Sequence, residues 1–410
     1  MKIVINKNNL FSFNSIVVLA LLFLGALNFL GRHSIWFLLA FIFMLMVQRV
    51  KVKLNAAVVF LFLFSVFYML FSDSVSIGVV GLVTLFIYMM CYITGYNLVD
   101  NIDTIEIRER KFNIILLVLM AGNFMHFLLN LLINYNQITS RNTLDFWTRQ
   151  VMSATGQSVL ACLAIAIGCA FVLSDCNTKY KVIACVILGL VIYYNLILAG
   201  RTIFVMLIIL LTVAYGNYLI NGTVKKNKIR KFIGLILFVL LLYFAYEQNI
   251  MGLKTIVEHS NFYNRFWNPY ASEHIMDDSR MSVKAEYVKR FLEHPWGGNF
   301  LKDEIGKYAH DLLLDIYDDA GIFAFIAMTG YVLSTMMNLF RVMRSKYTSF
   351  LTKQLVLCVY VAIYIEFFLE PIIAGMPWIL TEFCLIDGVV FHMLRKAKRN
   401  GGVRYADCSN

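Results

Sequence analysis

One polar stretch, residues 253–311, gathers side chains that could do acid, base or anion-binding chemistry. It holds four of the seven histidines and eight of the 36 Lys and Arg residues. A histidine ring can accept a proton from a hydroxyl near neutral pH, and an arginine guanidinium holds phosphate oxygens at any pH. These residue types favour chemistry on a phosphate-bearing substrate.

The rest of the chain is too apolar for a soluble protein. Its 410 residues are 60% hydrophobic and 15% charged, with a mean hydropathy of +0.72, which excludes an ordinary soluble domain. A hydrocarbon core about 30 Å thick needs roughly 20 apolar residues per helix. We therefore expect an all-α polytopic integral membrane protein with about 12 transmembrane helices, at 12–31, 33–48, 54–72, 75–97, 112–134, 151–173, 182–199, 202–220, 232–249, 320–340, 354–373 and 377–394.

The distribution of Lys and Arg predicts the topology, because short basic loops stay cytoplasmic. With the N-terminus inside, the inner segments hold 24 of these residues, the short outer loops four and the long loop eight. Both termini are then cytoplasmic, and the net charge of +11 needs no nucleic acid partner. The predicted organisation is helices 1–9 in 1–249, a large extracytoplasmic loop in 250–319, helices 10–12 in 320–394 and a cytoplasmic tail in 395–410.

Within the long loop, Ser279 can cap the start of a helix that runs to about Glu293. Pro295 and the glycines that follow it end this helix. Helical spacing puts two sets of side chains on two faces of it: Met281, Ala285, Val288 and Leu292 on one, and Arg280, Lys284 and Tyr287 on the other.

A second loop helix is expected to start at His310 and to continue into the tenth span after Gly321. Four aspartates share one side of it: Asp311, Asp315, Asp318 and Asp319. A solvated acidic face explains them better than a metal site.

Arg201 stands in an apolar setting between two central spans, where an arginine is costly and is a functional candidate by default. It could instead extend to the outer interface or pair with Glu366, Glu370 or Glu382, and those carboxylates could simply join helices. Arg280 could be a solvated residue and His310 an ordinary surface histidine. His310, however, stands where loop and membrane meet, and it could accept a proton from a sugar hydroxyl.

Several of these elements together resemble the O-antigen polymerase and ligase superfamily. They are Gly200-Arg201 between central helices, Arg280, the turn Pro295 to Gly298, and His310 followed by Leu313, Leu314 and Gly321. The layout covers nearly the whole chain, although the motif residues are few. One departure concerns the residue after the histidine, which is usually Asn in that family and is Asp311 here.

The resemblance implies a metal-independent inverting glycosyltransferase without a cofactor. It would polymerise undecaprenyl-diphosphate-linked oligosaccharides at the outer face of a bacterial cytoplasmic membrane. Arg201 and Arg280 would hold the diphosphate, and His310 would activate the acceptor hydroxyl. Further substrate contacts are expected from Arg265, Tyr287, Trp296, Glu366 and Glu370, and a chain-length regulator would fit as a partner.

Three alternatives remain open at this point. A ligase of the same superfamily would transfer finished glycan to a lipid or protein acceptor by the same chemistry. A transporter of lipid-linked sugars also reaches twelve spans, but it would not need the long loop. A lipid-phosphate-sugar transferase of the other large membrane class would be expected to carry acidic residues in its first outer loop, and none occur around Arg32.

Overall fold

The computed structural model describes residues 11–47, 50–72, 79–99, 104–135, 142–174, 176–221, 241, 243–260, 262–263 and 279–400. Most of these residues are helical, as expected. They divide into two compact units. Unit 1 contains the described parts of 1–125, 283–352 and 367–410, and unit 2 contains those of 126–282 and 353–366.

Among the described residues, seven helices are long and apolar enough to cross a membrane. They are α5 (Ile105–Asn134), α6 (Ala154–Leu173), α7 (Thr178–Leu198), α8 (Thr202–Asn221), α15 (Leu312–Arg344), α16 (Phe350–Leu369) and, over Pro377–Leu394, α18 (Pro377–Asn400).

Four shorter apolar segments coincide with the first four predicted spans: α1 (Phe13–Ala26), α2 (His33–Val47), α3 (Ala56–Phe71) and the part Leu85–Leu98 of α4 (Val79–Leu98). The predicted ninth span, 232–249, lies largely outside the described residues. The prediction of an all-α membrane protein is thus confirmed, while the count of twelve and the side of the termini stay predictions.

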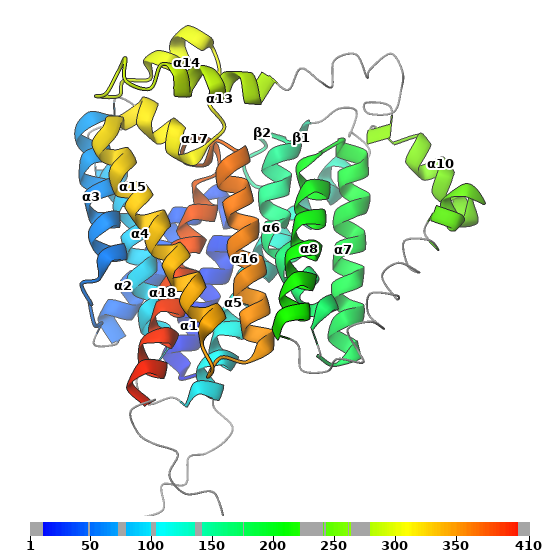
Figure 1. The fold of residues 1–410 in the computed structure, drawn as a ribbon, viewed down its shortest axis with the longest axis horizontal. Coiled ribbons are helices and arrows are strands. Elements are labelled where there is room, and N and C mark those ends of the chain that lie inside the picture. The colour runs from blue at the N-terminus through cyan, green and yellow to red at the C-terminus, as the bar shows by residue number, and fades with distance from the viewer. Residues whose placement is uncertain are drawn as a thin grey trace, which may run out of the picture. The chain divides into compact units, whose positions relative to one another are not determined.

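In unit 1, α3 packs along α15, α4 along α18, and α1 along α2 (Figure 1). The α4 and α18 backbones approach so closely that each helix needs a glycine at the contact. A Cβ on Gly95 would collide with the carbonyl oxygen of Leu385, and one on Gly388 would collide with that of Tyr92. Small residues allow this close approach in membrane proteins, where dispersion contacts hold helices together.

Buried polar pairs also join the helices of unit 1. The amide of Asn123 on α5 donates to Glu382 on α18 over 2.7 Å, and Asn338 on α15 donates to Asp387 on α18 over 3.0 Å. Each pair satisfies a carboxylate oxygen that would otherwise be costly in an apolar interior.

Unit 2 is organised around α6, which packs against both α7 and α8. Where α5 leads to α6, the chain forms a short antiparallel hairpin of β1 (Asn142–Leu144) and β2 (Val151–Ser153), with Asn142 opposite Ser153. The unit also contains the turn η2 (Ile250–Gly252) and the short helix α10 (Leu253–Glu258).

The long loop contains α13 (Ser279–Lys289) and α14 (Phe300–Ile305), and α17 (Ile372–Gly375) lies between α16 and α18 in the chain. The first loop helix begins at Ser279 as predicted, but it ends at Lys289 and not near Glu293. The second begins after His310 and continues into the span through a break at Gly321, as expected. In Figure 1, α13 and α14 lie beyond the end of the bundle at which α15 begins.

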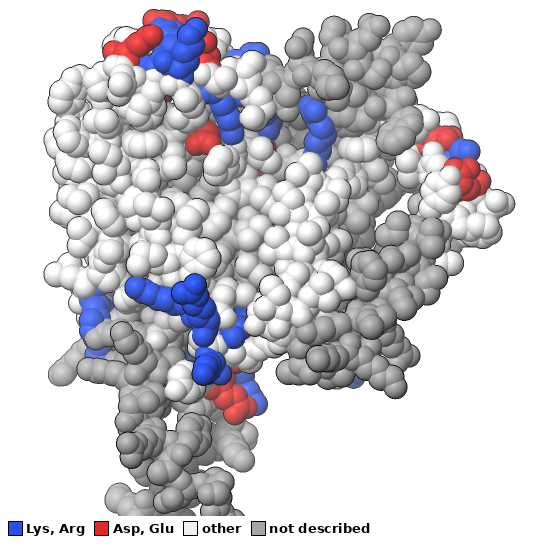
Figure 2. Space-filling view, in the orientation of Figure 1, with Lys and Arg blue, Asp and Glu red and all other residues white. Residues whose placement is uncertain are grey.

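Charged side chains are segregated along unit 1. In Figure 2, a broad face without charge separates the charged groups around α13 and α14 from the Lys and Arg near the far end of α15. That helix ends with Arg341 and Arg344 in its last turn. An uncharged belt between two charged ends is what a bilayer requires of the surface it covers.

Replacing Gly388 by Ala should lower the midpoint of thermal unfolding in detergent, because overpacking typically costs about 1–3 kcal/mol and here the methyl group meets rigid backbone. Gly216→Ala is the matched control, since nothing lies within 4 Å of a Cβ at that helical position. Equal midpoints for the two variants in a circular dichroism melt would contradict the close contact of α4 and α18.

Candidate functional site

Residues 283–320 form a small folded unit at the start of α15, which we call the loop module. Its core consists of Val283 and Tyr287 from α13, Leu301 from α14, and Ala309. The hydroxyl of Tyr287 donates to the carbonyl of Lys307 over 2.9 Å. The predicted apolar face of α13 is therefore the exposed one, because Met281 and Val288 point to the outside while Val283 and Tyr287 are buried.

The four aspartates of α15 are buried and do not form the solvated acidic face that we expected: Asp311, Asp315, Asp318 and Asp319. Their spacing puts them on one side of the helix start, and that side faces the loop module. Each carboxylate accepts hydrogen bonds there, mostly from main-chain N–H groups. Burial is tolerated because these charge-assisted bonds replace water.

Asp315 holds the turn that presents His310. Its two oxygens accept the N–H groups of Ala309 at 2.8 Å and Asp311 at 3.2 Å, the residues on either side of the histidine. His310 itself adopts a left-handed backbone conformation with φ of 56°, which costs a non-glycine residue roughly 1–2 kcal/mol. The carboxylate of Asp315 thus stabilises a backbone geometry that His310 would not choose alone.

Asp311 joins the histidine turn to α13. One of its oxygens caps α15 by accepting the N–H groups of Leu313 and Leu314 at 3.0 and 3.3 Å. Its other oxygen lies 3.6 Å from the ammonium of Lys284. Lys284 also donates to the carbonyl of Phe368 at the end of α16. The sequence did not reveal these contacts of Lys284.

Asp318 and Asp319 attach the remainder of the loop. Asp318 accepts the N–H groups of Leu301 and Lys302 at 2.9 and 3.0 Å, which caps the start of α14. Asp319 accepts from the side chain of Asn299 at 2.8 Å. It also accepts from Tyr68 and Ser72 of α3, so the loop module is tied directly to the membrane bundle.

The turn Pro295 to Gly298, here the glycine turn, closes against the break in α15. Ile322 donates its N–H to the carbonyl of Pro295 over 2.8 Å. Gly297 and Gly321 have φ of 83° and 74°, and a Cβ on either would meet the backbone of the other segment at 2.7 Å. Both positions therefore require glycine for conformation and for space.

Arg201 belongs to unit 2 and is exposed at the start of α8. The turn before it is held by Asn195 of α7, whose side-chain amide donates to the carbonyl of Gly200 over 2.7 Å. Ala199 closes α7 in the left-handed conformation. Asn195 is a second supporting residue that the sequence analysis missed.

The hairpin of unit 2 is fixed by three polar side chains one turn apart on α5: His126, Asn130 and Asn134. Asn134 exchanges two hydrogen bonds with the backbone of Leu144, at 2.8 and 2.9 Å. Asn130 accepts the N–H of Phe146 at 2.7 Å. Polar residues that repeat every four positions in an apolar helix are the sequence signal of this arrangement.

His126 completes this set with a buried contact to the hairpin. Its Nε2 lies 2.6 Å from a carboxylate oxygen of Asp145, and the other Asp145 oxygen accepts from Trp147 and Thr148. Burial alone would raise the pKa of Asp145, but the hydrogen bonds from His126 and Thr148 outweigh it and lower the pKa from 3.8 to about 2.

The other predicted site residues fall in different settings. Arg280 lies in the first turn of α13, one turn before Lys284. Glu366 and Glu370 are fully buried, and their pairing with Arg201 stays a prediction. Arg265 lies outside the described residues.

Two further predicted contacts have partners inside the loop module or the bundle. Tyr287 is buried in the core of the loop module. Its position gives no support to the predicted substrate contact, which stays a prediction. Trp296 is exposed, and its ring lies 5.8 Å from that of Phe71 and 5.9 Å from that of Phe323.

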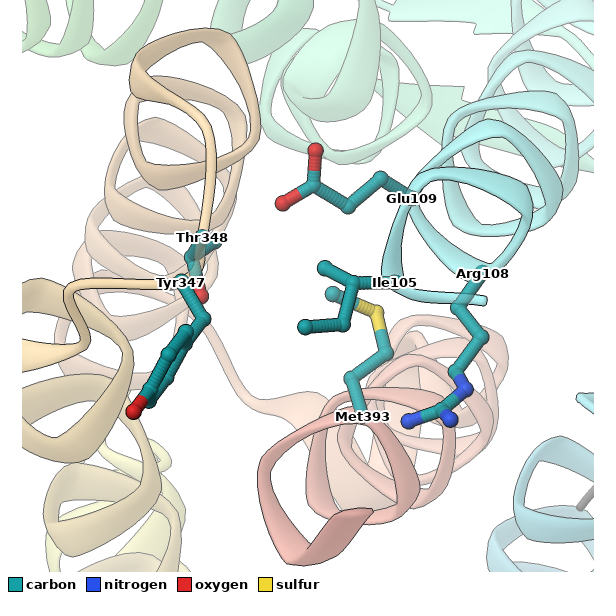
Figure 3. A pocket seen from close by; sticks show the side chains of 6 residues that line it. All are labelled: Ile105, Arg108, Glu109, Tyr347, Thr348 and Met393. Carbon is teal, nitrogen blue, oxygen red and sulfur yellow. The ribbon is translucent and has the colours of Figure 1, made fainter. Parts of the chain in front are cut away.

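A separate pocket lies at the other end of α15, between the start of α5, the link from α15 to α16, and α18 (Figure 3). Its lining residues are Ile105, Arg108, Glu109, Tyr347, Thr348 and Met393. Glu109 accepts the N–H of Ser349 over 2.7 Å, so its carboxylate joins α5 to the link. None of the predicted site residues line this pocket.

Neither a known family model nor a curated protein matches this chain.

The chemistry available in the loop module rests on the imidazole of His310 and on cationic neighbours, because the ring of the other histidine, His294, stacks on Phe300. His310 is partly exposed in a turn that Asp315 fixes, which suits a proton acceptor that must meet a substrate. Within the described residues, no three His, Cys, Asp or Glu side chains are placed to hold a metal ion. The acidic groups nearest the histidine instead bind main-chain N–H groups.

Replacing Asp315 by Asn should loosen the histidine turn, because the amide can accept only one of the two N–H groups and leaves the other buried without an acceptor. Such a loss costs about 1–3 kcal/mol. Hydrogen exchange at Ala309 and Asp311 should accelerate in the variant. Asp303→Asn is the control, since Asp303 is exposed on α14, and equal exchange in both variants would contradict the role of Asp315.

The hairpin should lose its attachment to α5 as the pH falls from about 4 to about 2. The pKa of Asp145 is about 2 when folded and 3.8 ordinarily, so its stabilising bonds are complete above pH 3.8 and disappear as the folded carboxylate takes up a proton. Fluorescence of Trp147, isolated by comparison with a Trp147→Phe variant, should report this change. Asp145→Asn should remove the transition, and a transition that persists in it would refute the assignment.

Proposed function

We propose that the protein is a membrane glycosyltransferase that polymerises undecaprenyl-diphosphate-linked oligosaccharide units at the outer face of a bacterial cytoplasmic membrane. The observation that carries this proposal is His310, presented in a left-handed turn that Asp315 clamps at the point where α15 enters the bundle. A strained, fixed histidine at this boundary suits a catalytic base for a substrate whose reacting bond lies just outside the lipid.

In the proposed reaction, the acceptor hydroxyl attacks the anomeric carbon of the donor sugar. The new glycosidic bond forms as the bond from that carbon to the diphosphate oxygen breaks, with inversion. The proton of the hydroxyl passes to His310, and the diphosphate leaves with the bonding electron pair. General-base help of this kind typically contributes about 10²–10⁴-fold in rate.

Guanidinium groups would stabilise the charge that develops on the leaving group. Arg201 and Arg280 are the candidates for this role, because fixed donors act most strongly where charge appears in the transition state. Arg201 is exposed in a turn that Asn195 holds. Lys284 is already engaged with Asp311 and the end of α16, which gives it a supporting role beside the histidine.

The proposal predicts that His310→Ala and Arg280→Ala abolish long polymer while the protein remains in the membrane. His259→Ala is the matched control, because His259 also lies in the loop segment but at the end of α10. Its Nδ1 atom there lies within hydrogen-bonding distance of the carbonyl oxygen of Thr255. Polysaccharide gels of the three variants would be compared in cells lacking the native gene. Polysaccharide of normal chain length from the His310 or Arg280 variant would refute the catalytic role proposed for that residue.

A second arm uses purified protein in vesicles with lipid-linked repeat units. Polymer should form in the presence of a chelator. Attachment of finished glycan to another acceptor, with no lengthening of the chain, would favour the ligase chemistry of the same superfamily. Movement of the lipid-linked sugar across the vesicle without new glycosidic bonds would favour a transporter.

A further inference from the structure

The part of α15 that follows the break carries an apolar stripe on its outer side. Five side chains form it, each between 41% and 63% exposed: Phe323, Ile326, Leu333, Met337 and Phe340. Their spacing puts them on one face of the helix. In a helix that crosses a membrane, a face of this kind contacts lipid chains and not water.

The length of the stripe locates the two edges of the hydrocarbon. From Phe323 to Phe340 the helix rises about 26 Å at 1.5 Å per residue, close to the hydrocarbon thickness of about 30 Å. Arg341 and Arg344 follow immediately, as expected where a helix leaves the lipid. Phe323 therefore stands at the opposite edge, next to the loop module.

Trp296 of the glycine turn lies on this edge. Its ring is 5.9 Å from Phe323 of α15 and 5.8 Å from Phe71 at the end of α3, yet 61% of the residue is exposed. Tryptophan is enriched at the boundary between hydrocarbon and headgroups, because its ring is apolar and its N–H is polar. Leu292 and Phe300, which flank the turn in the sequence, are also exposed.

The turn that carries Trp296 cannot move independently of the bundle. Pro295 accepts the N–H of Ile322 just past the break, and Gly297 packs on the backbone of Asp319 and Gly321. Asn299, on the other side of the turn, donates to the carboxylate of Asp319. The position of Trp296 is therefore coupled to the position of the start of α15.

We propose that the glycine turn is a membrane anchor, with the indole of Trp296 seated among the headgroups and upper acyl chains of the leaflet on the side of the loop module. The occupant of this surface is lipid, since the ring of Trp296 lies beside Phe323, the first residue of the lipid-facing stripe of α15. The predicted contact of Trp296 with a sugar substrate would require the same ring to face water. The anchor sets the height of the loop module, and so of His310, above the hydrocarbon.

The test uses the full chain in phosphatidylcholine vesicles and subtracts the fluorescence of Trp296→Phe from that of the native protein. The chain has five tryptophans, and the difference isolates one. Lipids brominated near the headgroup end of the acyl chain should quench this signal more than lipids brominated near the chain end. Aqueous iodide should quench it weakly.

The conservative variant keeps an aromatic ring against Phe71 and Phe323, so its helical melting curve should match that of the native chain. Three results would overturn the anchor. They are strong quenching by iodide with none by brominated lipid, strongest quenching from the chain end, or a shift of the signal on adding lipid-free oligosaccharide. None of these measurements depends on glycosyl transfer, so failure of the anchor is distinguishable from failure of the proposed function.

Discussion

The loop module depends on the carboxylates at the start of α15 and the N–H groups they accept. Asp315 and Asp318 each bind two main-chain N–H groups, around His310 and at the start of α14 respectively. Asp311 caps its own helix. A loop of this size has too small an apolar core to order itself, and these charge-assisted bonds supply what the core lacks. Without them, the N–H groups would be buried without acceptors, which costs more than the bonds themselves contribute.

Because those aspartates lie at the start of a helix that continues into the membrane, the loop module is rigidly attached to the bundle. The break at Gly321 lets α15 change direction, and the glycine turn fills the space that the break opens. Asp319 adds a direct tie to α3 through Tyr68 and Ser72. A histidine carried by such a turn is held in a fixed position relative to the bundle, which would suit the proposed reaction on a lipid-anchored substrate.

Unit 2 applies the same physical principle at a different place. His126, Asn130 and Asn134 are polar residues within an apolar helix, and they are retained because the hairpin offers them partners. The hairpin strands are only three residues long and would not be stable as an isolated pair. In both units, side chains of a membrane helix order an adjoining loop by binding its backbone.

The sequence by itself determined the membrane class, the positions of the described apolar helices, the start of α13 at Ser279 and the continuation of α15 past Gly321. Long apolar runs and glycines that end or break a helix are local signals, so they can be interpreted without knowing which distant segments pack against them. The sequence did not determine which side of each loop helix is buried, and the expected solvated face of Asp311 to Asp319 was wrong. Nor did it reveal the hairpin, or the contact of Lys284 with Asp311. Those features depend on which backbone groups from distant segments come to face a side chain, and only the tertiary structure decided that.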